Sequence, residues 1–530
     1  MAAAFFIAFF LLTIDYLLLT GPVRAADRSN VPLKNWGGFS VNRSWVYDAL
    51  EKIVLAGLAD QVILNTKPLS RVEAARIVAQ AVQKVKLDEG GDYNHRGYLE
   101  DQLYRLVEEF GPELAEMGVK TPLNRGAAGS FYGIKPVDHV QLGVDFASRS
   151  KSLVNSFGRR VEKGGNPYGT LDGRLHLGDY FSLYYQPEFL WNQDSYHGRL
   201  ATGYAKFTLW NTEFEAGRDS LWWGPGFRGS MLFSNNALPL DQVRVSAAEP
   251  FRLPWLLSYL GPVKATLLVG RLEESRDFPR AHVGGYRFNL APFSFLELGH
   301  GRAFQFGGEG RGFRARDFPR ILFTQGSDNS NSPLNINNLI SWDVTFRIPD
   351  VQRYLYFTRD LSLYLEIGWD DTHHGYFVPD RPGGIVGAYF AGWLGDPKLD
   401  LRLEYAQTSE IMFRHGTYTS GFTHRGSVLS HFVGTDGEEL YARVSRWLRP
   451  DLLLGFHTSW AKIGPSQTGL LDRPREQRHS FGFDVSYRVS DQSSIFLGYD
   501  FARIEDRGFV AGRSADENFF RIEFTRSFGK

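Results

Sequence analysis

Several histidines of this 530-residue chain stand near carboxylates, a combination of residue types that can bind metals. His373 and His374 precede Asp380, an imidazole and carboxylate set of the kind that binds zinc. Adjacent histidines in an extended segment point in opposite directions, and no helical i,i+4 pair supports them. We therefore expect a solvated loop here, and no metal site.

A second group of reactive residue types lies in one later loop, where His424, His431 and Asp436 accompany two serines. A serine, a histidine and an aspartate could together hydrolyse an ester. The spacing lacks the nucleophile elbow of the hydrolases, so we expect no catalytic residue and no enzyme. The glycine-rich stretch 307–312 lacks the lysine and the strand–helix context of a phosphate loop. No cofactor is expected.

Residues suited to contact a sugar stand close together in the middle of the chain. Trp222 and Trp223 are adjacent, so in a strand their rings point to opposite faces. One ring could stack on a sugar, while packing in a core or at a membrane interface is the alternative. Asn235 and Asn236 offer amide donors and acceptors that suit sugar hydroxyls and equally suit loop capping.

The elements that must position these residues are strands, because apolar and polar residues alternate through most of the chain. Each such strand has one apolar and one charged face. From about residue 140 to the end, this pattern predicts a mainly β fold, a transmembrane antiparallel barrel with a polar lumen. About 390 residues remain there, room for about 16 to 18 strands of roughly 10 residues plus turns. The clearest alternation is that of Leu399, Leu401, Leu403 and Tyr405 with Asp400, Arg402 and Glu404.

The composition agrees with a barrel. Lys plus Arg and Asp plus Glu both number 59, so the net charge is zero and no nucleic-acid partner is indicated. The mean hydropathy of −0.27 is too polar for a helical membrane protein, yet 15% of residues are aromatic. Charged lumen residues lower the mean hydropathy, and aromatic girdles raise the ring count. The absence of cysteine excludes disulfides and thiolate metal sites.

The N-terminal residues 1–26 are predicted to be a signal peptide. An apolar run from Ala2 to Leu12 is followed by small residues, and cleavage is expected after Ala25 or Ala26. A permanent anchor helix is the alternative. That alternative would place Asp15 in the bilayer, where a carboxylate costs about 2.5–3.5 kcal/mol.

Residues 27–123 are predicted to form a small helical periplasmic domain, followed by a linker, 124–137, and the barrel, 138–530. Apolar residues recur at helical spacing in the first segment, and a third helix is expected from about Leu99 to Met117. The linker contains the glycine-rich sequence Asn-Arg-Gly-Ala-Ala-Gly.

Ser70 and Glu73 form a capping box at the start of the second predicted helix. This region resembles one S-layer homology module, in which Trp45 and the sequence Ser-Arg-Val-Glu at 70–73 occupy the matching positions. The resemblance implies binding to peptidoglycan or another wall polymer through Trp45, Arg71 and Glu73. A periplasmic plug or spacer without a ligand is the alternative.

Two segments of the predicted barrel resemble a known family. The first reads Trp-Trp-Gly-Pro-Gly at 222–226 and Ser-Asn-Asn-Ala at 234–237. The second, 418–436, contains Gly-Phe-Thr-His-Arg-Gly and Ser-His-Phe-Val-Gly-Thr-Asp. Together they resemble the Wzi-type capsule assembly family over about 138–528. The resemblance implies about 18 strands, extracellular loops that close the barrel mouth, and a non-enzymatic role in holding capsular polysaccharide.

Candidate polysaccharide-binding residues come from these two segments and from the strand that follows the first. Arg244 and Glu249 are also expected to form ion pairs in the lumen, because an unpaired charge facing lipid is costly. The candidates are Trp222, Trp223, Asn235, Asn236, Arg244, Tyr418, His424, Arg425, His431 and Asp436.

The expected partners are capsular or exported polysaccharide, outer-membrane lipid and the barrel-assembly machinery. The last strand ends close to Phe528, and a terminal strand of this kind resembles the signal that this machinery reads. A porin tethered to the cell wall through the N-terminal module is the competing interpretation.

Overall fold

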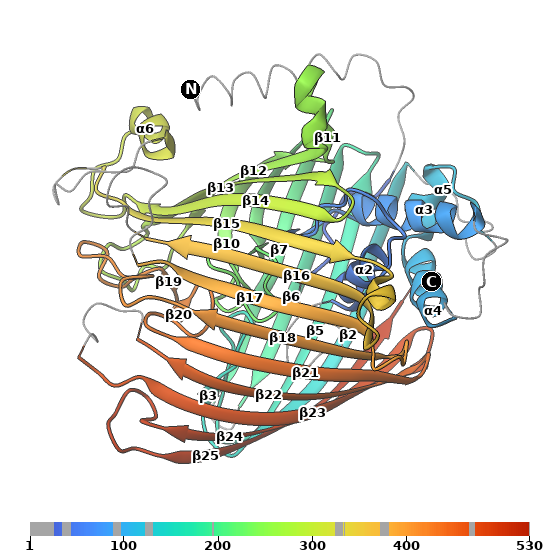
Figure 1. Ribbon diagram of the computed structural model, residues 1–530. Helices are drawn as coiled ribbons and strands as arrows, with labels where there is room; N and C mark the ends of the chain where they lie inside the picture. The colour runs from blue at the N-terminus through green and yellow to red at the C-terminus, as the bar shows by residue number, and fades with distance from the viewer. Residues whose placement is uncertain are drawn as a thin grey trace.

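The computed structural model describes residues 26–33, 44–87, 97–121, 131–192, 195–323, 332, 334–370, 381–465 and 472–528. Within these ranges, 18 antiparallel strands close into a barrel, which confirms the predicted fold class and strand number (Figure 1). The first and last strands complete the cylinder, with His139 opposite Ser527 and Ala147 opposite Phe519.

In order around the barrel, the strands are β2 (Tyr132–Ala147), β5 (Gly164–Leu177), β6 (Phe181–Trp191), β7 (Tyr196–Leu209), β8 (Thr212–Asp219), β10 (Leu240–Ala247), β12 (Pro262–Arg271), β13 (His282–Phe293), β14 (Leu296–Phe306), β15 (Asn337–Ile348), β16 (Thr358–Trp369), β17 (Gly383–Trp393), β18 (Leu399–Gln407), β21 (Glu438–Arg449), β22 (Leu452–Ile463), β23 (Glu476–Ser490), β24 (Ser493–Glu505) and β25 (Ala515–Ser527).

The two ends of the barrel differ in the length of their connections. At one end most of the turns are short, such as Pro450 and Asp451 between β21 and β22. At the other end the connections are longer; they include 408–437, whose strands β19 and β20 lie on the left of Figure 1, and 220–239, whose strand β9 pairs with β1. Short turns on the periplasmic side and long loops outside are usual in outer-membrane barrels. The connections contain β3 (Lys151–Ser152), β4 (Arg160–Val161), β9 (Trp222–Trp223), β11 (Phe251–Arg252), β19 (Thr423–His424), β20 (Ser427–Val428), η4 (Trp255–Leu260), η5 (Ala315–Asp317), α6 (Phe318–Phe323) and η6 (Val351–Arg353).

The alternation seen in the sequence separates the two faces of the wall. On β16, Leu363 and Leu365 lie on the outside, whereas Tyr364 and Glu366, which alternate with them, are buried in the lumen. The predicted division into an apolar exterior and a polar interior is therefore correct. Aromatic residues are strongly exposed at the short-turn end, where Trp255 is 92% exposed, as expected for a girdle at the membrane interface.

Four helices lie at the short-turn end, α2 (Trp45–Leu55), α3 (Arg71–Leu87), α4 (Gly97–Glu109) and α5 (Gly111–Glu116) (Figure 1). The predicted capping box is present, since the Ser70 amide donates to Glu73 at 2.9 Å and the Glu73 amide donates to Ser70 Oγ at 3.2 Å. None of the described helices is long and apolar enough to span a bilayer.

Two predicted boundaries differ from the structure. The single helix expected from Leu99 to Met117 is wrong, because Pro112 at the start of α5 lacks the amide needed to continue α4. Strand β2 begins at Tyr132, inside the predicted linker 124–137. Its pairing with β5 shifts register around Pro136, and this irregularity hides the alternation in the sequence.

Some predictions concern residues outside the described ranges. These are nearly all of the signal peptide, 1–26, and the histidine pair with its aspartate, His373, His374 and Asp380.

Candidate functional site

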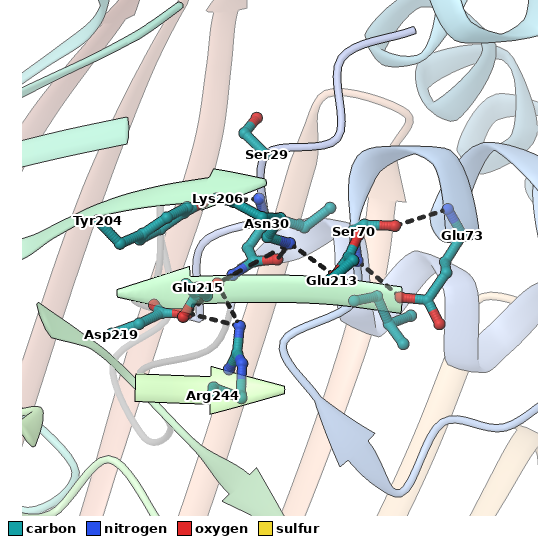
Figure 2. A network of polar contacts seen from close by, with 12 residues as sticks. Ser29, Asn30, Ser70, Glu73, Tyr204, Lys206, Glu213, Glu215, Asp219 and Arg244 are labelled. Atoms are coloured by element: carbon teal, nitrogen blue, oxygen red, sulfur yellow. Dashed lines mark hydrogen bonds and ion pairs between the residues drawn. The ribbon is translucent and has the colours of Figure 1, made fainter. Parts of the chain in front are cut away.

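The segment before α2 enters the barrel and inserts Asn30 into a polar network of the wall (Figure 2). The Asn30 amide donates to the Tyr204 hydroxyl at 2.7 Å. Its side-chain nitrogen donates to Glu215 Oε2 and to Asp219 Oδ2, each at 2.8 Å. All four residues are buried, so the N-terminal segment is bound to the lumen by charge-assisted hydrogen bonds.

Arg244 completes this network from the neighbouring strand β10. Its Nη2 lies 2.6 Å from Glu215 Oε2 and 3.2 Å from Asp219 Oδ2. The predicted lumenal ion pair of Arg244 is thus confirmed. Glu249 is also paired, and its partners, Arg28 and Arg76, belong to the N-terminal segment.

A second contact joins the N-terminal unit to a long loop inside the lumen. Strand β1 (Thr66–Lys67) pairs with β9, which places Thr66 opposite Trp223. Beneath this pair, Arg287 Nε donates to Thr66 Oγ1 at 2.6 Å, and its Nη2 donates to Asp343 at 2.7 Å. Arg287 and Asp343 side chains are both 0% exposed.

Ion pairs join the helices to two further strands of the barrel wall, β18 and β12. Lys52 of α2 lies 2.6 Å from Asp400 on β18, and Glu73 of α3 lies 2.5 Å from Lys264 on β12. Apolar residues of the helices share a core with Trp222 of the lumenal loop. The N-terminal unit is therefore a plug fixed at several points around the barrel.

The two adjacent tryptophans lie inside the molecule. Trp222 is 1% exposed, and its Nε1 donates to the Gly226 carbonyl at 3.1 Å. Trp223 is 0% exposed and meets Phe233 edge-on at a ring distance of 5.0 Å. Both rings therefore pack in a core, which is the alternative to sugar stacking that the sequence left open. Contact of either ring with a sugar stays a prediction, and it would require these loops to separate.

The two asparagines connect three long loops. Asn236 Nδ2 donates to the Val428 carbonyl at 3.0 Å, and its Oδ1 accepts from the Asn155 amide at 3.5 Å. The backbone carbonyl of Asn235 accepts from the Phe157 amide at 2.8 Å. These contacts correspond to the loop-capping alternative, and they hold the long loops together across the mouth of the barrel.

The candidate residues of the late loop have separate surroundings. Tyr418 is buried, its hydroxyl donates to the Gly307 carbonyl at 3.2 Å, and burial raises its pKa to about 12. His424 Nδ1 lies 2.8 Å from Glu273. His431 is buried, and burial together with the charge of Arg228 lowers its pKa to about 3.

The late loop also contributes the most accessible candidates. Arg425 is exposed, and Asp436 is half-buried with Arg475 at 3.3 Å. His424 pairs with Glu273, the charge of Arg228 acts on His431, and Asp436 pairs with Arg475, so these three residues have different partners. The remaining candidates that the structure buries are Trp222, Trp223, Asn235, Arg244, Tyr418, His424 and His431.

The predicted wall-binding residues are engaged in internal contacts. Arg71 is 5% exposed and binds Glu113 at 2.5 Å and Glu109 at 2.7 Å. Burial alone would raise the pKa of Glu109, but Arg71 lowers it to about 2. Glu73 is buried against Lys264. Trp45 is half-buried beneath the guanidinium of Arg105.

One group among the described residues has the spacing of metal ligands, Asp138, His139 and Asp172, whose ligand atoms lie within 4.8 Å of one another. Arg174 already binds Asp138 at 2.9 Å, and the Tyr184 hydroxyl donates to Asp172 at 3.3 Å. Both carboxylates therefore already have partners within the protein.

Sequence reasoning missed the residues that fix the plug, Asn30, Arg287 and Asp343. Arg287 and Asp343 are separated by 56 residues, and Asn30 and Asp219 by 189. No local spacing marks such pairs. The sequence offered only a general indication of these residues, because charged residues on the lumenal face of strands require partners.

Comparisons with known proteins agree with the geometry. A family model described as capsule assembly protein Wzi matches residues 141–518. A Klebsiella pneumoniae relative, described as an uncharacterized 55.8 kDa protein in the cps region, is 25% identical over 347 residues, which are 63% of this chain. The alignment spans 57% of the length of that relative.

A solved structure, described as Wzi, an outer-membrane protein involved in group 1 capsule assembly in Escherichia coli and a carbohydrate-binding β-barrel, is similar in fold. The likeness has a TM-score of 0.70 at 19% identity and covers 93% of this chain and 100% of that one. Pseudomonas aeruginosa OccD3 (OpdP) reaches a TM-score of 0.44 at 11% identity, over 75% and 94% of the two chains, too low to support an argument. Because the family model extends over well more than half of the chain, from β2 to β25, the protein belongs to the Wzi capsule assembly family.

Proposed function

We propose that this protein is an outer-membrane barrel that binds and organises capsular or exported polysaccharide at the cell surface without catalysing a reaction. Family membership supports this role. The observation that carries it against a transport role is the filled lumen, in which β1 of the plug pairs with β9 of a long loop. A barrel filled in this way suits a surface scaffold better than a channel.

The long-loop end is the proposed polysaccharide-binding face. Loops at this end are cross-connected by Asn236 and Val428 and therefore offer a preorganised surface. Arg425 is exposed there, and a guanidinium has several donors for sugar hydroxyls or carboxylates.

Deletion of the gene in a capsulated strain is expected to increase the shed fraction of polysaccharide at the expense of the cell-associated fraction. Both fractions can be measured after gentle centrifugation. The wild-type gene should restore retention, Arg425→Ala should restore it less well, and Arg446→Ala, an exposed residue at the opposite end, should act like the wild type. Unchanged retention in the deletion strain would argue strongly against the proposed function.

A tethered porin is the second candidate, and the filled lumen predicts a different electrical behaviour. Purified protein inserted into planar lipid bilayers is expected to show no steady conductance, because plug and loops occupy the pore. An open porin inserted into the same bilayers provides the control. A large, stable conductance per inserted molecule would favour the porin.

The helical unit is proposed to face the periplasm, since short turns usually lie on that side. Contact with peptidoglycan or another wall polymer stays a prediction. Arg71 and Glu73 are already paired within the protein, so such contact would depend on other residues of the unit.

A further inference from the structure

A cavity of about 150 Å³ lies between the N-terminal helices and the barrel wall, at the short-turn end, and Phe227 of the loop 220–239 also lines it. Trp45 of α2 and Arg105 of α4 line one side. Trp447 of β21, together with Tyr487 and Arg488 of β23, lines the other. A cavity of this volume has room for a single six-membered ring.

Two guanidinium groups in this cavity form no close ion pair with a carboxylate of the described residues, although Glu108 and Glu109 act on Arg105, and Asp101 interacts with Arg488, at longer range. Arg105 stacks on the Trp45 ring, 3.7 Å from its centroid, and no carboxylate of the described residues lies within 4.0 Å of its side chain. The Arg488 side chain likewise has no carboxylate within 4.0 Å in the described part of the chain. Burial and the neighbouring charge of Arg488 lower the pKa of Arg105 to about 9, against the opposing effect of Glu109 and Glu108. The protein therefore keeps two like charges close together, an arrangement that an anion would stabilise.

The carboxylates that line the cavity do not supply this anion, because they already have partners. Asp400 binds Lys52 at 2.6 Å, Asp451 binds Arg449 at 3.1 Å, Glu523 accepts a hydrogen bond from the Tyr168 hydroxyl at 2.6 Å, and Asp48 acts electrostatically on Arg443.

The chemistry of the lining defines the ligand. A guanidinium binds a carboxylate through two parallel hydrogen bonds. The aromatic side chains of Trp45, Trp447 and Tyr487 line the cavity, and aromatic rings suit the carbon face of a sugar ring. We propose that this cavity binds a carboxylate-bearing pyranose, such as a uronic acid unit, of an acidic polysaccharide. The inference rests on the proposed function and adds a second binding site, at the end of the barrel opposite the loops.

The test measures binding of small acidic and neutral sugars to the purified full-length protein in detergent by isothermal titration calorimetry. Trigalacturonate is the acidic probe and maltotriose the neutral one. The double variant Arg105→Gln/Arg488→Gln should weaken trigalacturonate binding at least tenfold. The wild type and Arg446→Gln, whose exposed side chain pairs with Asp396 at the same end, should bind it alike, and maltotriose should bind all three proteins equally weakly.

Heat-modifiable mobility on gels establishes that each variant is folded. If the double variant does not fold, Arg488→Gln alone provides the test, since this residue is half-buried and should still weaken binding at least threefold. Equal trigalacturonate affinity in wild type and folded variants would overturn the inference. So would preferential binding of glucose 1-phosphate, which would indicate a phosphate site.

Failure of this inference can be distinguished from failure of the proposed function. If the wild type and the double variant retain cell-surface polysaccharide equally well and also bind trigalacturonate equally, the cavity assignment falls and the proposed function stands. If deletion of the gene leaves retention unchanged, the proposed function falls. Loss of trigalacturonate binding in the variant would support the cavity as an acidic-sugar site in either case.

Discussion

Replacing Arg287 with alanine is expected to lower the free energy of unfolding by about 3–5 kcal/mol. The Arg287 side chain is 0% exposed and donates to Asp343, Thr66 and the Asn65 carbonyl. Its removal leaves the Asp343 carboxylate buried without its cation and also breaks the contact with the plug. The change can be measured as a shift of the urea midpoint in detergent, followed by tryptophan fluorescence.

Two comparisons make the Arg287 prediction specific. Arg446→Ala removes an exposed ion pair with Asp396 and should lower the free energy of unfolding by less than about 1 kcal/mol. The apolar double variant Arg287→Met/Asp343→Leu should recover much of the lost stability, because no unpaired buried charge remains. A cost for Arg287→Ala no larger than that for Arg446→Ala would mean that this ion pair does not hold the plug.

Replacing Trp223 with alanine is expected to lower the free energy of unfolding by about 3–5 kcal/mol and to loosen the loop 220–239. Trp223 is 0% exposed, its ring packs against Phe233, and its amide donates to the Phe233 carbonyl at 3.1 Å. The side chain belongs to a core of loop and wall residues, and the backbone of Trp223 pairs with the plug strand β1, so a cavity at this position weakens the seal of the lumen. Hydrogen exchange of the loop 220–239 should become faster.

The matched control is Trp255→Ala, since Trp255 is 92% exposed on the outside of the barrel. This variant should leave hydrogen exchange in the loop 220–239 unchanged. Equal protection of that loop in wild type and Trp223→Ala would show that Trp223 does not hold the loop in the lumen.

The candidate site could be predicted only in part. The family to which the chain belongs was correctly identified from the segments around Trp222 and His424, and Arg244 was correctly expected in a lumenal ion pair. The exposure of these residues could not be predicted, because it depends on how three loops fold back over one another. Trp223 therefore lies in a core, whereas Arg425, close to His424 in the sequence, is exposed.

The sequence by itself determined the barrel, because lipid on one side of a strand and a polar lumen on the other impose a period of two that each strand carries locally. It also determined the capping box of Ser70 and Glu73, whose partners are three residues apart. Only the tertiary structure decided that the helical unit plugs the lumen. The contacts of Asn30 and Arg287 join segments far apart in the sequence, and their geometry is set by strand register and barrel closure, which local residue patterns do not encode.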